Sequence, residues 1–283
     1  MPDVAPFLTT HIILDKFIGI IDCGPKRAIG ELIEHIKRIA TMENIKYVFL
    51  THIHIDHAGG IGLLLKYLPN AYVVVHPRGA KHLVNPEKLW KSTRKVLGDL
   101  ATFYGDIEPV IEDRIIIGED GMNIELGEDN LTIFETPGHS SHSFTFYLEN
   151  LQAIFPGDLA GVFIEPWKVA FPTTPMPFNY EKAVRSLQML MNLEPKHIFF
   201  PHYGHTDGAM DYLEKYVEKL DLWVKIVEEN IDSNYNQILT ILLKKDKDLS
   251  EKYHLISRHP IWKESIIRSI HGIKSYIEWR KTR

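Results

Sequence analysis

The segment THIHIDHAGG, residues 51–60, places three histidines and one aspartate within six residues. It directly follows the apolar run KYVFL, which is typical of a buried strand. Residues two apart in an extended chain point to the same side, so His52 and His54 can bind one cation. Asp56 and His57 come after the chain turns, and they can face a second cation. Imidazole and carboxylate groups are the usual non-thiolate ligands of Zn²⁺, and iron and manganese accept the same donors. The segment therefore predicts a metal-binding loop at a strand end.

Four donors on one loop cannot complete two coordination spheres, so further ligands are expected at other strand ends. His139 lies in TPGHS, Asp158 in FPGD and His202 in FFPHYG. Each follows an apolar run and a proline or glycine turn, which is where open α/β sheets gather their sites. Together with the first loop, these three residues complete a predicted set of seven metal ligands.

The composition narrows the class of protein. The chain has 283 residues, a formal net charge of −5, 15 His and a single Cys. One cysteine excludes a disulfide framework and an all-Cys zinc site. The net acidity argues against a basic nucleic-acid surface. No run reaches the length of a membrane span, and the first 24 residues lack the pattern of a signal peptide, so a cytoplasmic protein is the expectation.

Two patterns divide the chain into a predicted α/β domain, residues 1–208, and a helical C-terminal region, residues 209–283, packed on it. Apolar runs bounded by turn signals predict strands in the first part, with amphipathic helices between some of them. Strand signals end near residue 209, and long helical stripes follow. The expected strands are 11–14, 17–22, 47–50, 72–75, 114–117, 131–135, 143–148, 153–155 and 197–200. The expected helices are 29–39, 63–65, 86–97, 180–193, 213–231, 238–243 and 266–277.

The combination of motifs resembles the metallo-β-lactamase superfamily, nearer its glyoxalase II-like hydrolase branch. The matching residues are Asp22 in IIDCG, the loop 52–57, His139, Asp158 and His202, which occur in the family's order. The resemblance implies an α/β (α+β) fold, a four-layer αββα sandwich of two mixed sheets covered by helices. The metal site would lie at one edge, and the helices after residue 208 would form a C-terminal appendage.

The resemblance also implies an allocation of ligands to two divalent metal ions, with Zn²⁺ first and Fe or Mn as alternatives. One metal would be held by His52, His54 and His139, the other by Asp56, His57 and His202, with Asp158 bridging them. Asp22 would orient the ligand loop from behind. The implied chemistry is attack by a metal-bridging hydroxide on a small-molecule thioester, lactone or ester.

Four residues near the ligands have secondary expected roles. Asp56 is a candidate proton shuttle to the leaving group. Tyr203 is a candidate hydrogen-bond donor to a substrate oxygen, with simple packing as the equal alternative. His142 is expected to brace the ligand loop, and His205 is expected to be either a neighbour of the ligands or ordinary loop polarity. His76 and His82 are expected in a surface loop and helix, without a function.

Several alternatives stay open. Zinc β-lactamases commonly carry a Cys ligand where Asp158 stands, and the misplaced Cys23 argues against antibiotic hydrolysis. The segment after Asp158 lacks a glutathione-contacting pattern. An oxidoreductase resembling the persulfide dioxygenases would use one iron, two His and one Asp. An RNA- or phosphodiester-processing enzyme would use the basic run 274–283. A non-catalytic binder is the remaining alternative, and oligomer formation is not decided by the sequence.

Overall fold

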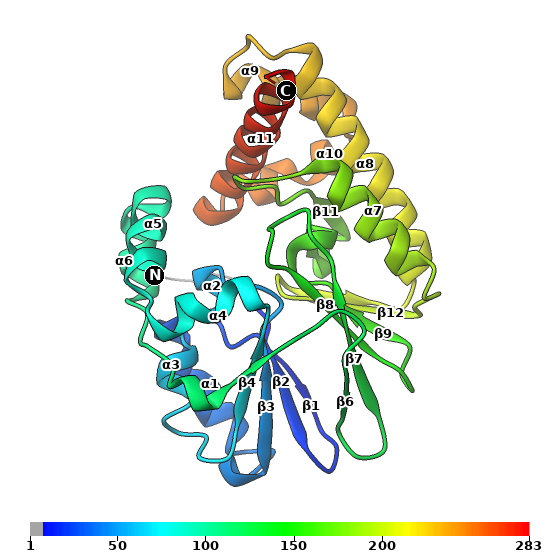
Figure 1. Cartoon of the computed structure of the whole chain (residues 1–283). Helices are drawn as coiled ribbons and strands as arrows, with labels where there is room; N and C mark the ends of the chain where they lie inside the picture. The colour runs from blue at the N-terminus through cyan, green and yellow to red at the C-terminus, as the bar shows by residue number, and fades with distance from the viewer. Residues whose placement is uncertain (1–7, 283) are drawn as a thin grey trace. The chain divides into compact units, whose positions relative to one another are not determined.

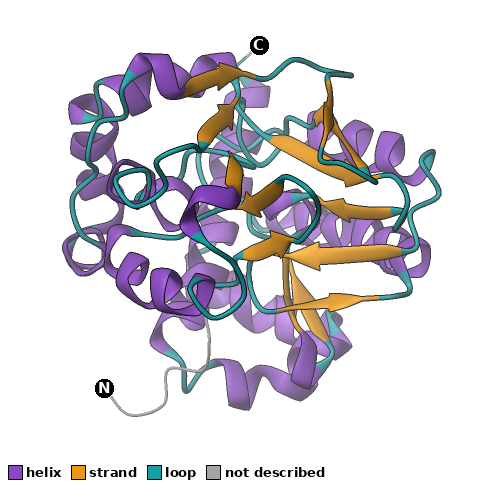
Figure 2. Ribbon diagram, turned by 90° about the horizontal axis from the view of Figure 1, so that it is seen from below, coloured by secondary structure: helices purple, strands orange, loops and turns teal. Residues whose placement is uncertain are grey.

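The computed structural model describes residues 8–282, in two compact units. We call residues 8–135 and 142–155 the N-terminal unit, and residues 136–141 and 156–282 the C-terminal unit. Strands and helices are mixed in both (Figure 2), so the predicted α/β class is confirmed. The expectation that the first 24 residues are not a signal peptide falls partly on residues 1–7, which lie outside the described part.

The N-terminal unit contains a five-stranded sheet in the order β1-β2-β3-β4-β5. β1 is antiparallel to β2, whereas β2 to β5 run parallel (Figure 1). The central strands read as nearly continuous apolar runs because both of their faces are covered. The strands are β1 (His11–Ile13), β2 (Ile18–Ile21), β3 (Ile45–Phe49), β4 (Tyr72–Val75) and β5 (Ile115–Ile117).

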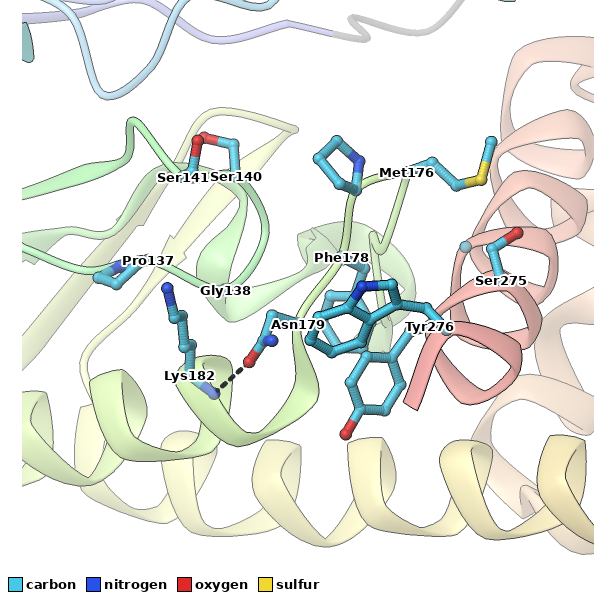
Figure 3. A pocket seen from close by; sticks show the side chains of 13 residues that line it. Pro137, Gly138, Ser140, Ser141, Met176, Phe178, Asn179, Lys182, Ser275 and Tyr276 are labelled. Carbon is cyan, nitrogen blue, oxygen red and sulfur yellow. Dashed lines mark hydrogen bonds between the residues drawn. The ribbon is translucent and has the colours of Figure 1, made fainter. Parts of the chain in front are cut away.

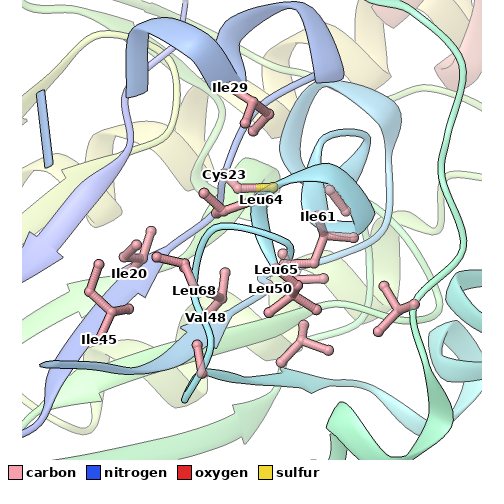
Figure 4. Packing of buried hydrophobic residues seen from close by; sticks show 14 of the residues in the cluster. Ile20, Cys23, Ile29, Ile45, Val48, Leu50, Ile61, Leu64, Leu65 and Leu68 are labelled. Atoms are coloured by element: carbon pink, nitrogen blue, oxygen red, sulfur yellow. The ribbon is translucent and has the colours of Figure 1, made fainter. Parts of the chain in front are cut away.

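Helices cover one face of this sheet. Figure 4 shows Ile20 and Val48 of the sheet, and Leu50 directly after β3, packed with Ile29 and Leu64 of the helices. All five are fully buried, at 0% exposure, so this cluster is a dry core that supports the strand ends. The helices of this unit are α1 (Ile29–Ile36), α2 (Ile55–Ala58), α3 (Ile61–Leu64), α4 (Pro77–Val84), α5 (Glu87–Leu97) and α6 (Asp99–Tyr104).

An antiparallel meander packs on the opposite face of the parallel strands. The rings of Phe49 on β3 and Phe146 on β8 lie 5.3 Å apart, which joins the two sheets. Along β7, Leu131 and Ile133 are buried while their neighbours are partly exposed, the alternation expected of a sheet with one covered face. The meander consists of β6 (Asn123–Glu125), β7 (Asn130–Glu135), β8 (Phe144–Leu148) and β9 (Ala153–Phe155).

The C-terminal unit combines two hairpins with long helices. The hairpins pair β10 (Val162–Ile164) with β11 (Val169–Phe171), and β12 (His197–Phe200) with β13 (Gly204–Thr206). The predicted stripe of Ile266, Ile270, Ile273 and Ile277 is fully buried. The helices are α7 (Tyr180–Met191), α8 (Ala209–Glu229), α9 (Tyr235–Lys245), α10 (Lys247–Ile256) and α11 (Pro260–Lys281).

The expected elements are all present, three strands (β4, β9 and β12) with the expected ends and the others with shifted ends, and the structure adds further elements. Four three-residue strands, β6, β10, β11 and β13, and the helices α2, α6 and α10 were not specified from the sequence, and α4 was expected only as a helix around His82. The boundary at residue 208 stays a prediction. Within residues 8–282, no helix combines the length and the apolarity needed to cross a bilayer.

One expectation about a histidine was wrong. His76 was assigned to a surface loop, but it is only 5% exposed and begins α4 as the cap residue. Its Nδ1 accepts a hydrogen bond from the Arg78 backbone N–H, and its Nε2 lies 3.1 Å from a Glu135 carboxylate oxygen. The sequence shows a polar residue before Pro77 but not the carboxylate that allows the ring to be buried.

Candidate metal centre

The N-terminal unit carries four of the seven predicted ligands, which we call the loop set: His52, His54, Asp56 and His57. His52 and His54 follow β3, and His54 has an extended backbone as the cap residue of α2. Asp56 and His57 lie on α2. His52 and His57 are about 1% exposed, and their rings lie 4.0 Å apart. The loop set is therefore a compact group of donors directly beyond the sheet.

Asp22 holds His57 in place from the neighbouring strand end. Its Oδ2 lies 2.8 Å from Nδ1 of His57, and both side chains are buried. Cys23 and Gly24 donate backbone hydrogen bonds to the carbonyl oxygen of His57, at 2.9 and 3.0 Å. Asp22 takes a left-handed φ of 51°, which turns the chain so that side chain and backbone reach the same residue. This geometry fits the predicted orienting role of Asp22, because it fixes the ring of His57 through Nδ1.

Thr51 fixes the orientation of His52 and was not singled out in the sequence. Its hydroxyl lies 2.7 Å from Oδ2 of Asp22 and 3.0 Å from Nδ1 of His52. An ionised carboxylate only accepts hydrogen bonds, so the hydroxyl proton points to Asp22 and the hydroxyl oxygen accepts from Nδ1 of His52. His52 is therefore protonated on Nδ1 and presents the lone pair of Nε2. The sequence feature that could have indicated this role is a hydroxyl-bearing residue directly before His52.

The Nε2 atom of His52 lies close to the ring of His54. Nε2 of His52 and Nδ1 of His54 are 3.0 Å apart. Two ligands at about 2.1 Å from one Zn²⁺ would be separated by roughly 3.0–3.4 Å, so the pair has the spacing of one edge of a coordination shell. The His142 ring stacks on His52, with centroids 6.3 Å apart, and meets His54 edge-on, with centroids 5.8 Å apart. This placement fits its expected bracing role.

The C-terminal unit carries the other three predicted ligands, which we call the turn set: His139, Asp158 and His202. All three are buried, at 3–5% exposure. Oδ2 of Asp158 lies 3.5 Å from Nε2 of His139, and Oδ1 lies 3.3 Å from Nε2 of His202. Each carboxylate oxygen thus faces a different imidazole, which is the arrangement that a bridging carboxylate requires.

His139 is oriented by a backbone carbonyl. Its Nδ1 lies 2.8 Å from the carbonyl oxygen of Thr173. The turn before it is clamped to α7, because Asn179 N–H donates to Gly138 O and the Ser186 hydroxyl donates to Pro137 O. A Cβ on Gly138 would come within 2.4 Å of the Ala183 backbone, so only glycine allows this close approach.

The remaining candidates lie around His202, in the turn between β12 and β13. The His202 ring meets buried Trp262 of α11 edge-on, at 6.1 Å. Tyr203 has a left-handed φ of 66° and a partly exposed side chain. His205 stacks on Phe199, and its Nε2 is 3.9 Å from Asp207. His205 is about half exposed, which fits the expectation of ordinary loop polarity better than contact with ligands.

The donor chemistry of both sets fits divalent cations. His52, His57 and His139 each have one ring nitrogen held by an oxygen of the chain, the arrangement typical of metal-ligating histidines. Cys23 adds no thiolate, since burial raises the pKa of its thiol. The structure thus brings the seven predicted ligands into two groups, one in each unit.

Comparison with known proteins gives a family. The model of the metallo-beta-lactamase superfamily matches residues 15–202. The metallo-beta-lactamase fold-containing protein ST1585 of Sulfurisphaera tokodaii is 29% identical over 218 residues, which cover 75% of this chain and 79% of that protein. The crystal structure of ST1585 from Sulfolobus tokodaii superposes on this chain with a TM-score of 0.65.

Two further similarities bear on fold and chemistry. The structure of a metallo-beta-lactamase family protein from Thermus thermophilus has a TM-score of 0.71 at 18% identity, covering 99% of this chain and 91% of that one. The hydroxyacylglutathione hydrolase of Legionella pneumophila strain Paris is 24% identical over 145 residues, 51% of this chain and 44% of that protein. Another matched relative is named as a nitric oxide reductase, from Moorella thermoacetica. The match over residues 15–202 and these shared folds show that the chain belongs to the metallo-beta-lactamase superfamily, whose members bind metals.

Proposed function

We propose that this chain is a dinuclear metal-dependent hydrolase of small-molecule thioesters, lactones or esters, and that the loop set and the turn set together form its metal centre. His52, His54 and His139 would hold one cation. Asp56, His57 and His202 would hold the other, and Asp158 would give one oxygen to each. Zn²⁺ is the proposed metal, with Fe and Mn as alternatives.

The observation that carries this proposal is the fixed orientation of three buried histidines. A metal-ligating histidine usually has one ring nitrogen hydrogen-bonded to an oxygen of the chain, which fixes the orientation of the ring and leaves the other nitrogen unprotonated. Thr51, Asp22 and the Thr173 carbonyl provide this at His52, His57 and His139. Three separate segments of chain thus prepare imidazoles for the same task.

The residues divide the work of hydrolysis. Bound divalent cations supply a nucleophilic water at neutral pH and polarise the scissile carbonyl. Asp56 stands on the first turn of α2 with a partly exposed carboxylate, suited to passing a proton to the leaving group. Tyr203 follows a ligand and is proposed to donate its hydroxyl proton to a substrate oxygen. No serine or cysteine nucleophile is required.

The test is metal content and turnover on the same preparations. Zinc-, iron- and manganese-loaded protein would be offered a thioester, a lactone, an aryl ester and a phosphodiester, with metals per chain measured by elemental analysis. We expect two metals per chain and turnover of a carboxylic substrate. His54→Ala should lose metal and activity, whereas His35→Ala, an exposed histidine of α1, should retain both. Full activity in His54→Ala, or preparations without any transition metal, would refute the proposal.

An oxidoreductase is the second candidate, because matched relatives include the nitric oxide reductase of Moorella thermoacetica. A mononuclear iron dioxygenase would leave Asp56, His57 and His202 without a metal to bind. One iron per chain together with consumption of O₂ would favour this candidate over the hydrolase.

Nucleic-acid processing is not supported by the C-terminal cations. Lys274 donates to the carbonyl oxygen of Ser233, and Arg280 pairs with Glu228. These two side chains therefore hold α11 against its neighbours, whereas Lys281 of the same run is exposed. Arg283, the last cation of that run, lies outside the described residues. A cytoplasmic location and an oligomeric state are left as expectations.

A further inference from the structure

A cavity of about 400 Å³ lies within the C-terminal unit, beside the turn that carries His139. Its lining comes from the Pro137–Gly138 turn, the loop before α7, the first turn of α7 and the last turns of α11 (Figure 3). This volume is in the range that holds a drug-sized molecule. Neither the seven proposed ligands nor the secondary candidates line it.

The cavity has an aromatic lining. Phe178 and Tyr276 meet edge to face with ring centroids 5.8 Å apart, and Tyr276 is 6.3 Å from Trp279. The Tyr276 hydroxyl is bonded to Glu181, so the residue presents its ring rather than its oxygen. Met176 and Trp279 are 54% and 44% exposed, unusual for large apolar side chains. Aromatic rings that line a cavity are suited to an aromatic guest, which can stack on them or meet them edge-on.

One cation stands at the edge of this lining. Figure 3 shows the Lys182 side chain rising from α7 toward Pro137 and Gly138. No ion pair of Lys182 occurs among the described residues, and the nearby Glu181 is bonded to Tyr276. The Asn179 side chain is also engaged, since it accepts the backbone N–H of Lys182 as the helix cap. The ammonium group is therefore the available partner for an anionic ligand.

The cavity wall and a proposed ligand share one rigid segment. Gly138 lines the cavity and directly precedes His139. The carbonyl oxygens of Pro137 and Gly138 accept hydrogen bonds from Ser186 of α7 and from Asn179, its cap residue. A molecule in the cavity is thus held at a fixed position relative to His139. Such placement is what binding of a non-reacting part of a substrate requires.

We propose that this cavity binds an aromatic group bearing a carboxylate, with Phe178, Tyr276 and Trp279 contacting the ring and Lys182 pairing with the carboxylate. This proposal rests on the proposed function in so far as the bound group is the non-reacting part of the substrate. The hydrolysed bond would then join that group to the rest of an ester or thioester.

The first test is binding to the full-length, metal-loaded protein, measured by calorimetry with 2-naphthoate and its neutral analogue 2-naphthamide. Trp279→Ala should weaken both about three- to tenfold, because an aromatic contact is lost. Lys182→Gln should weaken 2-naphthoate roughly two- to fivefold and leave 2-naphthamide unchanged. Lys168→Gln removes an exposed lysine of the same unit and should change neither. Unchanged 2-naphthoate binding in both cavity variants would overturn the proposal, because neither the ring nor the carboxylate would then be bound by this cavity.

The second test separates the cavity from the catalytic proposal. Lys182→Gln should lower kcat/KM for an acetate ester of a carboxylated naphthol and not for the uncarboxylated ester. His54→Ala should abolish turnover of both esters while retaining its difference in affinity between 2-naphthoate and 2-naphthamide. Cavity-dependent binding without hydrolysis of any ester, thioester or lactone would refute the hydrolase and support the ligand class. Hydrolysis that is insensitive to both cavity variants would refute the cavity as a substrate site.

Discussion

The Nδ1 atom of His139 donates a hydrogen bond to the carbonyl oxygen of Thr173, 2.8 Å away. A carbonyl oxygen only accepts, so Nδ1 carries the proton and Nε2 is the atom that faces Asp158. The loop of Thr173 is in turn held by α11, because the Thr174 hydroxyl donates to Ser269 O and the Ser269 hydroxyl to Pro172 O. The C-terminal helix therefore positions a proposed metal ligand through one loop.

Gly272 allows this contact between α11 and the loop. A Cβ at this position would stand 1.6 Å from the carbonyl oxygen of Thr174. We expect Gly272→Ala to lower the free energy of unfolding by about 1–3 kcal/mol, because overpacking outweighs the better helix propensity of alanine. Metal content should fall as well, since the loop that orients His139 must move. Thermal unfolding and elemental analysis measure the two effects.

Gly30→Ala is the matched control. Gly30 also lies within a helix, α1, but nothing stands within 4 Å of its would-be Cβ. This substitution should stabilise the protein by about 0.5–1 kcal/mol and leave metal content unchanged. If both substitutions changed the free energy of unfolding and the metal content equally, the close packing of α11 against Thr174 would not be the cause of the effect at Gly272.

Removal of the Thr51 hydroxyl should weaken metal binding without removing a ligand. Thr51→Val keeps the shape and the backbone bond to Asp22, but His52 loses the acceptor for Nδ1. We expect metal affinity to fall roughly 10–100-fold, as for other partners of ligand histidines. Competition with a chromophoric chelator measures this, and Thr51→Ser should retain most of the affinity. Wild-type affinity in the valine variant would contradict the assigned tautomer.

The loop set and the main helices could be predicted because their signals are local. His52, His54, Asp56 and His57 lie on one short segment, and the isoleucine stripe of α11 repeats along one helix. The short strands β10 and β11 could not be predicted, because each has three residues and gains its bonds only from the other. Their definition depends on pairing, which a single run of sequence does not contain.

The supporting contacts could not be predicted for a related reason. Thr173 acts on His139 through a backbone carbonyl, which every residue type has, from 34 positions away. Likewise, the sequence alone shows Gly272 only as a residue that weakens a helix. The structure shows that Thr174 packs against it so closely that a Cβ would not fit. The type of a residue shows whether its side chain can bind a metal. Which other groups hydrogen-bond that side chain and fix its orientation depends on the fold.

His76 should make stability depend on pH. Burial lowers the pKa of this ring, opposed by the nearby Glu135 carboxylate, and protonation would place a proton on the Nδ1 that caps α4. Its folded pKa lies below the ordinary value of 6.5, so its contribution to stability is present above that pH and is lost as the pH falls. His76→Asn keeps a cap acceptor and does not titrate. Between pH 7 and 5, wild type should therefore lose more unfolding free energy than this variant in parallel denaturant titrations. Parallel curves would contradict the depressed pKa.

Metal removal should lower thermal stability through the residues proposed as ligands. A cation that binds only the folded chain at 1,000 times its Kd adds about 4 kcal/mol, so a chelator should lower the Tm and excess Zn²⁺ should restore it. Asp158→Asn keeps the volume of the side chain but removes the negative charge facing His139 and His202. Its Tm should respond much less to chelator and Zn²⁺, whereas His35→Ala should respond as wild type does. If the Tm of Asp158→Asn responded as that of wild type does, Asp158 would not be a metal ligand, because a bridging carboxylate cannot lose its charge without a loss of metal affinity.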